Sequence, residues 1–198
     1  FIKTPSFNFC PQSKTISFCD ISIMFCLFSS KYKFEEFKII EVVNNVTHDL
    51  SKLITKYKHT LHLNIENDIT ILGDKEKITI AIKNLVLKAI IHSPIENSII
   101  INVISNKKHS VLEIINTGVN ITNEDIKNIF KPFYRVDKSR TKHEDFGNGL
   151  GLFITKEIIN KRKTQHPEFF IENEEQLNKE TYTFIIFNRE LDYLKKEQ

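Results

Sequence analysis

The chain has 198 residues, of which 40% are hydrophobic and 27% are charged, and its 28 basic and 25 acidic side chains give a formal net charge of +3. Because both signs are mixed along the chain, this balance excludes a protein that coats nucleic acid with one positive surface, and we expect no nucleic-acid partner. The length fits one domain with an appendage, which can fold around its own core without a metal or a disulfide.

Residues 1–33 show neither a helical nor a strand period and form an unassigned N-terminal segment. Their three cysteines, Cys10, Cys19 and Cys26, are odd in number and lack metal-site spacing, which indicates reduced thiols in a cytoplasmic setting. The apolar stretch at 21–28 is too short to cross about 30 Å of hydrocarbon. We therefore expect a soluble chain without membrane contact, and the absence of an initiating Met suggests a fragment.

From Glu35 onward, the spacing of apolar residues predicts alternating helices and strands. Repeats of three or four residues are typical of an amphipathic helix, and strict alternation is typical of a strand with one buried face. Pro94 ends the second helix, and Thr122 with Asp125 resembles a capping box that opens a short helix. In chain order, helices are expected at 35–57, 75–92, 122–129 and 150–161, and strands at 61–65, 69–72, 98–104, 110–116, 168–173 and 181–187.

These elements predict an α/β sandwich of two layers, because the strands mostly pair as sequence neighbours and the helices share one face. The strands at 98–104 and 110–116 form an antiparallel hairpin. Residues 131–148 form a long polar loop, which is unusual inside a compact domain and is expected to act as a lid, mobile over 133–147.

Gly147, Gly149 and Gly151 occupy every second position before the last predicted helix, in a chain with only five glycines. Such a cluster fits either a loop that cradles phosphate or a flexible turn, and the glycines alone do not decide between them. A dinucleotide-binding loop is disfavoured because no strand leads directly into the cluster. A Walker-type loop is excluded because Gly-Lys-Ser/Thr is absent.

Four segments stand in the order and spacing of the four ATP-site boxes of sensor histidine kinases. They are KNLVLKAIIHS (83–93), INTGVNI (115–121), IFKPFYRVDKSR (129–140) and GNGLGLFITKEII (147–159). The chain most resembles the vancomycin-resistance-type sensor kinases of bacterial two-component systems. Any one box is weak evidence, but four in order, with GDKEKI ahead of the first, are strong.

This resemblance implies the Bergerat fold, an α+β sandwich whose helices cover one face of a mixed, mostly antiparallel sheet and which holds ATP under a lid. The ATP-binding domain would occupy residues 34–188, followed by a polar tail at 189–198. The glycines would let backbone amides approach the triphosphate at the positive end of a helix. Asn116 would accept a hydrogen bond from the adenine amino group, where most members carry an aspartate.

The resemblance also implies a wider set of residues around the nucleotide. Arg135, Lys138 and Arg140 would face phosphates, while Phe130, Phe133 and Tyr134 would pack at the base of the lid. The complete implied nucleotide-binding set is Asn84, Lys88, Asn116, Gly118, Ile121, Phe130, Tyr134, Arg135, Lys138, Arg140, Gly147, Gly149, Leu150, Gly151 and Leu152.

The first box departs from the family pattern Asn-x-x-x-Asn-Ala-x-Lys-Tyr. Asn84 is present, but Lys88 replaces the second asparagine and Ile91 replaces the lysine. These three residues lie along one helix face, so all three would look into the site. Mg²⁺ requires oxygen ligands, and Asn84 alone supplies one. Two readings remain. In one, Lys88 holds nucleotide without metal; in the other, the chain is a decayed remnant.

The implied activity is that of a protein histidine kinase, with Asn84 and Lys88 at the catalytic position. It would transfer the γ-phosphoryl group of ATP to a histidine of a phosphoacceptor and dimerisation domain on another chain, and a response regulator would receive it. Family members are anchored in the bacterial membrane with this domain in the cytoplasm. His48, in THDL, is expected to be a surface histidine rather than the phosphoacceptor.

Two alternatives remain. One is a non-catalytic nucleotide-binding remnant, favoured by Lys88 and Ile91. The other is an ATP hydrolase of the chaperone and topoisomerase branch, which places a glutamate where this chain has Asn84. A carboxylate can take a proton from the attacking water and an amide cannot, so Asn84 favours transfer over hydrolysis.

Overall fold

A computed structural model describes residues 30–65, 69–105, 109–116, 122–136, 149–165 and 181–188. The chain divides into two compact units, Phe1–Lys31 and Tyr32–Gln198, and all the described helices and strands belong to the second. The three cysteines, the predicted strand at 168–173 and the tail at 189–198 lie outside the described residues.

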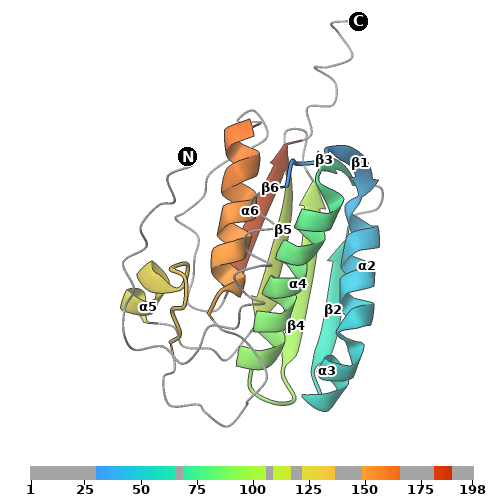
Figure 1. The fold of residues 1–198 in the computed structure, drawn as a ribbon. Coiled ribbons are helices and arrows are strands. Elements are labelled where there is room, and N and C mark those ends of the chain that lie inside the picture. Colours follow the sequence, from blue (N-terminus) through green and yellow to red (C-terminus); the bar gives the residue numbers. More distant parts are fainter. Residues whose placement is uncertain are drawn as a thin grey trace, which may run out of the picture. The chain divides into compact units, whose positions relative to one another are not determined.

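Helices and strands alternate along the second unit (Figure 1). The elements are β1 Glu35–Lys38, α2 Ile39–Asp49, α3 Ser51–Lys56, β2 Thr60–Ile65, β3 Thr70–Gly73, α4 Lys75–His92, β4 Ser98–Ser105, β5 His109–Asn116, α5 Asn123–Asn128, α6 Gly151–Gln165 and β6 Thr181–Asn188.

The main sheet has four strands in the order β2-β4-β5-β6. The β2–β4 pair is parallel, while β4–β5 and β5–β6 are antiparallel, and β1 pairs with β3 in a separate antiparallel ribbon. Helices α2, α4 and α6 lie side by side over one face of the main sheet (Figure 1). The predicted two-layer sandwich with a mixed, mostly antiparallel sheet is confirmed, as is the hairpin of β4 and β5.

The prediction of one continuous helix over 35–57 is wrong in two respects: its first residues form a strand, and the helix that follows is interrupted. Residues 35–38 form β1, where only Phe37 is buried, and α2 begins at Ile39, whose N–H donates to the carbonyl of Ile69 at 3.1 Å. The helix then breaks at Leu50, which leaves helical geometry before α3 begins. Apolar spacing survives the break because Leu50 is still buried, so the period alone did not reveal it.

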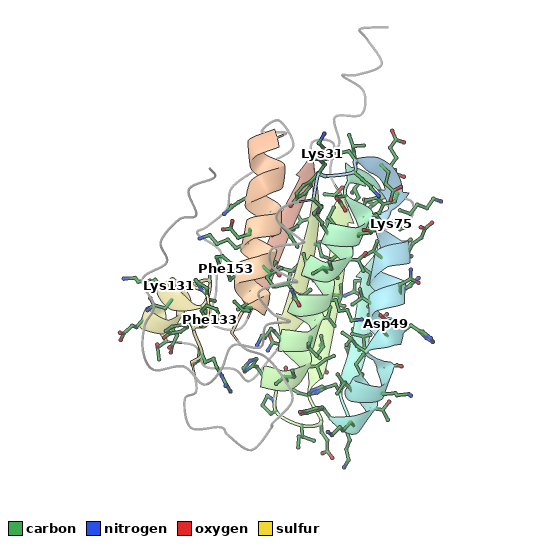
Figure 2. All side chains as sticks on the ribbon, viewed as in Figure 1. Lys31, Asp49, Lys75, Lys131, Phe133 and Phe153 are labelled. Atoms are coloured by element: carbon green, nitrogen blue, oxygen red, sulfur yellow. The ribbon has the colours of Figure 1, made fainter. Side chains whose placement is uncertain are left out.

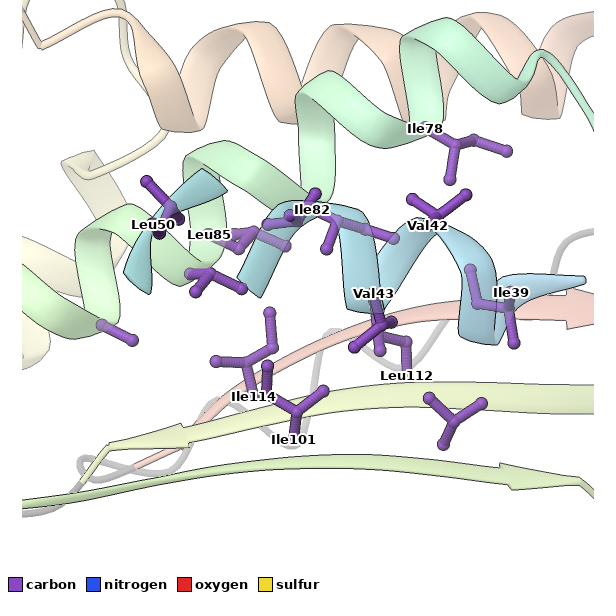
Figure 3. Packing of buried hydrophobic residues seen from close by; sticks show 14 of the residues in the cluster. Ile39, Val42, Val43, Leu50, Ile78, Ile82, Leu85, Ile101, Leu112 and Ile114 are labelled. Carbon is purple, nitrogen blue, oxygen red and sulfur yellow. The ribbon is translucent and has the colours of Figure 1, made fainter. Parts of the chain in front are cut away.

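The core lies between the helical layer and the sheet (Figure 3). Helix α4 contributes one continuous buried stripe because its apolar residues recur at helical spacing. Each fully buried Ile or Leu contributes about 1.5–3 kcal/mol. The fully buried larger side chains are Ile39, Ile82, Leu85, Ile90, Ile99, Ile101, Leu112, Ile114, Val42, Val43, Val46 and Val86.

A buried ion pair fixes the beginning of α4. The Asp74 carboxylate accepts from the N–H of Lys77 at 3.0 Å, which caps the helix, and from its ammonium at 3.0 Å, and both side chains are 6% exposed. The ring of Tyr32 lies 4.1 Å from the Lys77 ammonium, and its hydroxyl donates to the carbonyl of Ile158 in α6 at 3.1 Å. This cluster therefore joins the start of the domain to both α4 and α6.

Replacing Asp74 by Asn is expected to destabilise the domain by about 3 kcal/mol at pH 7, because the variant keeps a helix cap but removes the negative charge that pairs with the buried Lys77 ammonium. Burial raises the pKa of Asp74, but hydrogen bonds from the backbone N–H groups of Lys77 and Lys33 and from the Lys77 side chain outweigh it, so its folded pKa lies below the ordinary value. The unfolded state then binds more protons in acid, and the stabilisation fades as pH falls below about 4.

Urea unfolding of both proteins at pH 7 and across the acid range measures this difference. Asp49→Asn is the matched control, because Asp49 pairs with Lys83 at 2.7 Å between exposed side chains on α2 and α4 and should matter little. Equal stabilities of the Asp74 variant and the control would contradict the role assigned to the buried pair.

Within the described residues, no helix combines the length and the apolar character needed to cross a bilayer. His48 lies exposed on α2, as predicted for a surface histidine.

Candidate functional site

The side chain of Asn84, in the middle of α4, reaches the beginning of α6. Its Nδ2 donates to the carbonyl oxygen of Gly151 at 3.3 Å. A Cβ built on Gly151 would lie 3.6 Å from the Asn84 side chain, at ordinary contact distance. The first box and the last glycine of the fourth box are therefore neighbours, although 67 positions separate them.

Gly149 packs against the backbone of the segment that follows α5. Its φ is +73°, and its carbonyl accepts from the N–H of Phe133 at 3.0 Å. A Cβ at Gly149 would lie 2.7 Å from the carbonyl carbon of Phe133 and 2.9 Å from the carbonyl oxygen of Tyr134. Only glycine allows the two backbone segments to lie this close, so position 149 requires glycine because of this backbone contact.

The segment that meets Gly149 is anchored to α5. The Tyr134 hydroxyl donates to Asp125 at 2.6 Å, and Asp125 also receives a hydrogen bond from the Thr122 hydroxyl at 2.6 Å. Thr122 accepts from the N–H of Asp125 at 3.1 Å and caps α5, so the predicted capping at this helix is confirmed. The hydrogen bond to Asp125 raises the pKa of Tyr134. Phe133 and Lys131 lie beside α5 in Figure 2.

Lys88 lies one turn after Asn84 on the same face of α4 and is half-buried. Burial lowers the pKa of its ammonium, and the positive charge of Arg135 lowers it further. Among the described residues, no carboxylate pairs with Lys88. Two cations therefore face the same region without a described counter-ion, an arrangement that favours a bound anion.

Asn116 is the last residue of β5 and is fully buried. Neither its Oδ1 nor its Nδ2 has a hydrogen-bond partner in the described part of the chain. Leaving a buried amide unpaired costs about 1–3 kcal/mol, so such a group calls for a partner. A ligand that offers both a donor and an acceptor would supply one.

These side chains lie at one end of the sandwich. Helix α4 ends at His92 and the chain turns directly into β4, whose Ile99 pairs with Asn116 across the sheet. The C-terminal half of α4, the end of β5 and the beginning of α6 are therefore close together (Figure 1). An amide, two cations and a helix N-terminus at one end of the fold can bind a base and a phosphate chain.

The residues present do not fit a Mg²⁺ ion. Asn84 supplies one side-chain oxygen, and the next residue along its face is the Lys88 ammonium, which repels a cation and offers no ligand. Among the described residues, no three His, Cys, Asp or Glu side chains are grouped so that they could hold a metal.

Several predicted site residues are placed by the structure. Leu150 is buried, Leu152 packs against the core, and Ile91 is half-buried on α4. The Lys156 ammonium lies 5.5 Å from the ring centroid of Phe130, which is half-buried. Phe133 is 41% exposed, and its backbone meets Gly149. The predicted residues outside the described part are Gly118, Ile121, Lys138, Arg140 and Gly147.

Sequence reasoning missed two supports of the site. Asp125 was identified only as part of a helix cap, whereas it also holds Tyr134. Phe133 has a φ of +64°, a conformation that a phenylalanine does not signal in a sequence. The spacing of Asp125 and Tyr134, nine positions apart across a short helix and a turn, carries no periodic signal.

Comparisons with known proteins identify a family and a fold for the chain. Residues 73–189 match the profile of a family described as histidine kinase-, DNA gyrase B- and HSP90-like ATPases. The chain is 30% identical over 161 residues to the phosphate regulon sensor protein PhoR of Haemophilus influenzae, a match that covers 81% of this chain and 36% of PhoR. It is 30% identical over 118 residues to the sensor protein VanSC of Enterococcus gallinarum, covering 60% of this chain and 32% of VanSC. The chain thus spans well under half of these relatives.

Solved structures of the histidine kinase ThkA are also similar. A nucleotide-free form of its catalytic domain is 25% identical, with a TM-score of 0.58, over 65% of this chain and 81% of that chain. ThkA in complex with the response regulator protein TrrA has the same fold, with 21% identity and a TM-score of 0.58 over 86% of this chain and 48% of that one.

Proposed function

Because the chain belongs to the family of histidine kinase-, DNA gyrase B- and HSP90-like ATPases, and is similar to two sensor proteins and to the catalytic domain of a histidine kinase, we propose that its 34–188 region is the ATP-binding catalytic domain of a two-component sensor kinase. The observation that carries the nucleotide assignment is the buried amide of Asn116, which has no partner within the described residues. Its Oδ1 can accept from the adenine amino group, as the resemblance implies.

The phosphates lie, in this proposal, between α4 and the beginning of α6. The N-terminus of α6 and the helix dipole favour an anion, and Asn84 holds the first turn in place through Gly151. Lys88 on α4 and Arg135, whose charges interact with each other, supply positive charge to the phosphates. Gly118, Ile121, Lys138, Arg140 and Gly147, together with Phe130, Tyr134, Leu150 and Leu152, complete the proposed set.

The proposed reaction is phosphoryl transfer. The bond between the β-γ bridging oxygen and the γ-phosphorus breaks, and a bond forms to a ring nitrogen of a histidine on a separate phosphoacceptor and dimerisation domain. An amide at position 84 orients groups but cannot deprotonate water, which supports transfer over hydrolysis. A response regulator is the proposed acceptor from that histidine, as the relative ThkA forms a complex with one. The proposed location is the cytoplasm.

A second candidate is a nucleotide-binding remnant without kinase activity. The half-buried Lys88, which stands where an oxygen ligand for metal is expected, favours it. In both candidates, Lys88 replaces part of the charge of the absent ion, and nucleotide is held largely without metal.

Calorimetric titration with ADP and ATP, in Mg²⁺ and in EDTA, tests the proposal. We expect saturable binding in both conditions. The affinities should agree within about threefold, because among the described residues Asn84 supplies only one side-chain oxygen to the metal. Incubation with labelled ATP and a phosphoacceptor domain of a histidine kinase then separates the candidates, because only a kinase labels the histidine. Absence of nucleotide binding in a folded chain would refute both candidates.

A further inference from the structure

The strand pattern places the Asn116 side chain on the helix-facing side of the sheet. Leu112 and Ile114 belong to the core cluster, and Asn116 follows them at the same two-residue spacing along β5. Its side chain therefore continues the inner face of the sheet at the point where the apolar core ends. This is the position at which the proposed function puts the base of the nucleotide.

Nothing described around Asn116 fixes which way its amide points. Elsewhere on the same sheet, two hydrogen bonds fix the orientation of the Asn102 amide. Its Oδ1 accepts from Asn64 at 2.9 Å, and its Nδ2 donates to Glu113 at 2.7 Å. Both polar atoms of Asn116 are unpaired within the described residues. Rotation of its amide by half a turn about the last side-chain bond therefore breaks no described hydrogen bond.

A carboxylate at this position could only accept hydrogen bonds, whereas an amide presents one donor and one acceptor side by side. A 6-aminopurine presents a donor at its exocyclic amino group and an acceptor at the adjacent ring nitrogen. A 6-oxopurine presents the reverse, an acceptor oxygen and a ring N–H. The two amide orientations of Asn116 complement these two edges in turn.

We infer that the site takes 6-oxopurine nucleotides as readily as 6-aminopurine nucleotides, with Asn116 as the residue that sets this relaxed base selectivity. The inference rests on the proposed nucleotide-binding function and extends it to the chemical class of the base. The base edge then meets a neutral amide that can take two orientations, instead of a group that can only accept.

Calorimetry of the unaltered chain with ADP and IDP is the direct test, because these nucleotides differ only at the 6 position and the adjoining ring proton. We expect their dissociation constants to agree within about fivefold, less than the loss of one buried hydrogen bond would cause. ADP binding with IDP weaker by more than about thirtyfold would overturn the inference and leave the proposed function standing. A folded chain that binds neither would refute both.

Asn116→Asp supplies the second arm. A carboxylate faces the 6-oxo group with a second acceptor, so the preference for ADP over IDP should rise by at least about tenfold. Asn64→Asp makes the same chemical change at an exposed position of β2 and should leave the ratio unchanged. A folded Asn116→Asp protein with the unaltered ratio would overturn the inference, and if that variant does not fold, the ratio in the unaltered chain decides.

Discussion

A Gly149→Val variant is expected to lose at least about hundredfold in affinity for ADP while its sheet and helices α2 and α4 stay folded. Gly149 has a φ of +73°, a conformation that costs a β-branched residue about 1–2 kcal/mol or more. In addition, its Cβ would lie 2.7 Å from the carbonyl carbon of Phe133, which real structures do not tolerate. The backbone of Phe133 and Tyr134 must therefore move away.

This movement affects the proposed site rather than the core. The hydrogen bond from the Phe133 N–H to the Gly149 carbonyl holds the two segments together immediately before α6 begins. Its loss displaces the first turn of α6, whose N–H groups are proposed to face phosphate. The core cluster contains neither residue, so the loss of binding is expected without global unfolding.

Calorimetry with ADP measures the binding loss, and circular dichroism with thermal unfolding establishes that the variant is folded. Thr60→Val is the matched control, because it introduces the same side chain at an exposed position of β2 outside the proposed site. It should leave affinity within about threefold. A folded Gly149→Val protein that binds ADP as the unaltered chain does would remove the glycine cluster from the site.

The layer architecture could be predicted because long elements carry strong patterns. Helix α4 has Asp74 at its cap, a full buried stripe and Pro94 beyond its end, so its sequence alone defines it. The short elements at 35–57 could not be predicted in the same way. A strand of four residues shows too little alternation to be distinguished from one helical turn, and β1 exists only because β3 offers a pairing edge.

The candidate site was predicted as a set of positions, but not as contacts. Motif spacing identified Asn84 and Gly151 separately, whereas the hydrogen bond between them depends on how α6 packs against α4. The resemblance indicated an acceptor at Asn116, yet only the structure shows that both of its amide atoms lack partners within the described residues. Tertiary contacts of this kind leave no periodic trace in a sequence.

Restoring an oxygen ligand should change the metal response of the site more than any other substitution on α4. In the double variant Lys88→Asn with Ile91→Lys, Asn84 and the new asparagine side chain stand one turn apart on one face and can offer two oxygens to a hard divalent ion. The new lysine at position 91, a further three residues along that face, returns a cation near the phosphates. We expect Mg²⁺ to strengthen ADP binding by at least about tenfold in this variant, against about threefold or less in the unaltered chain.

Transfer to a supplied phosphoacceptor domain should rise together with the metal dependence, because the same change removes an ammonium whose charge opposes the ion. Lys83→Asn is the control, since it makes the same replacement on the exposed side of α4, where Lys83 pairs only with Asp49 among the described ion pairs. Titrations with ADP in Mg²⁺ and in EDTA measure the first effect, and labelling of the phosphoacceptor histidine measures the second. Rapid, Mg²⁺-dependent labelling by the unaltered chain would show that Lys88 does not occupy the ligand position, and it would leave the metal-free mode of binding without support.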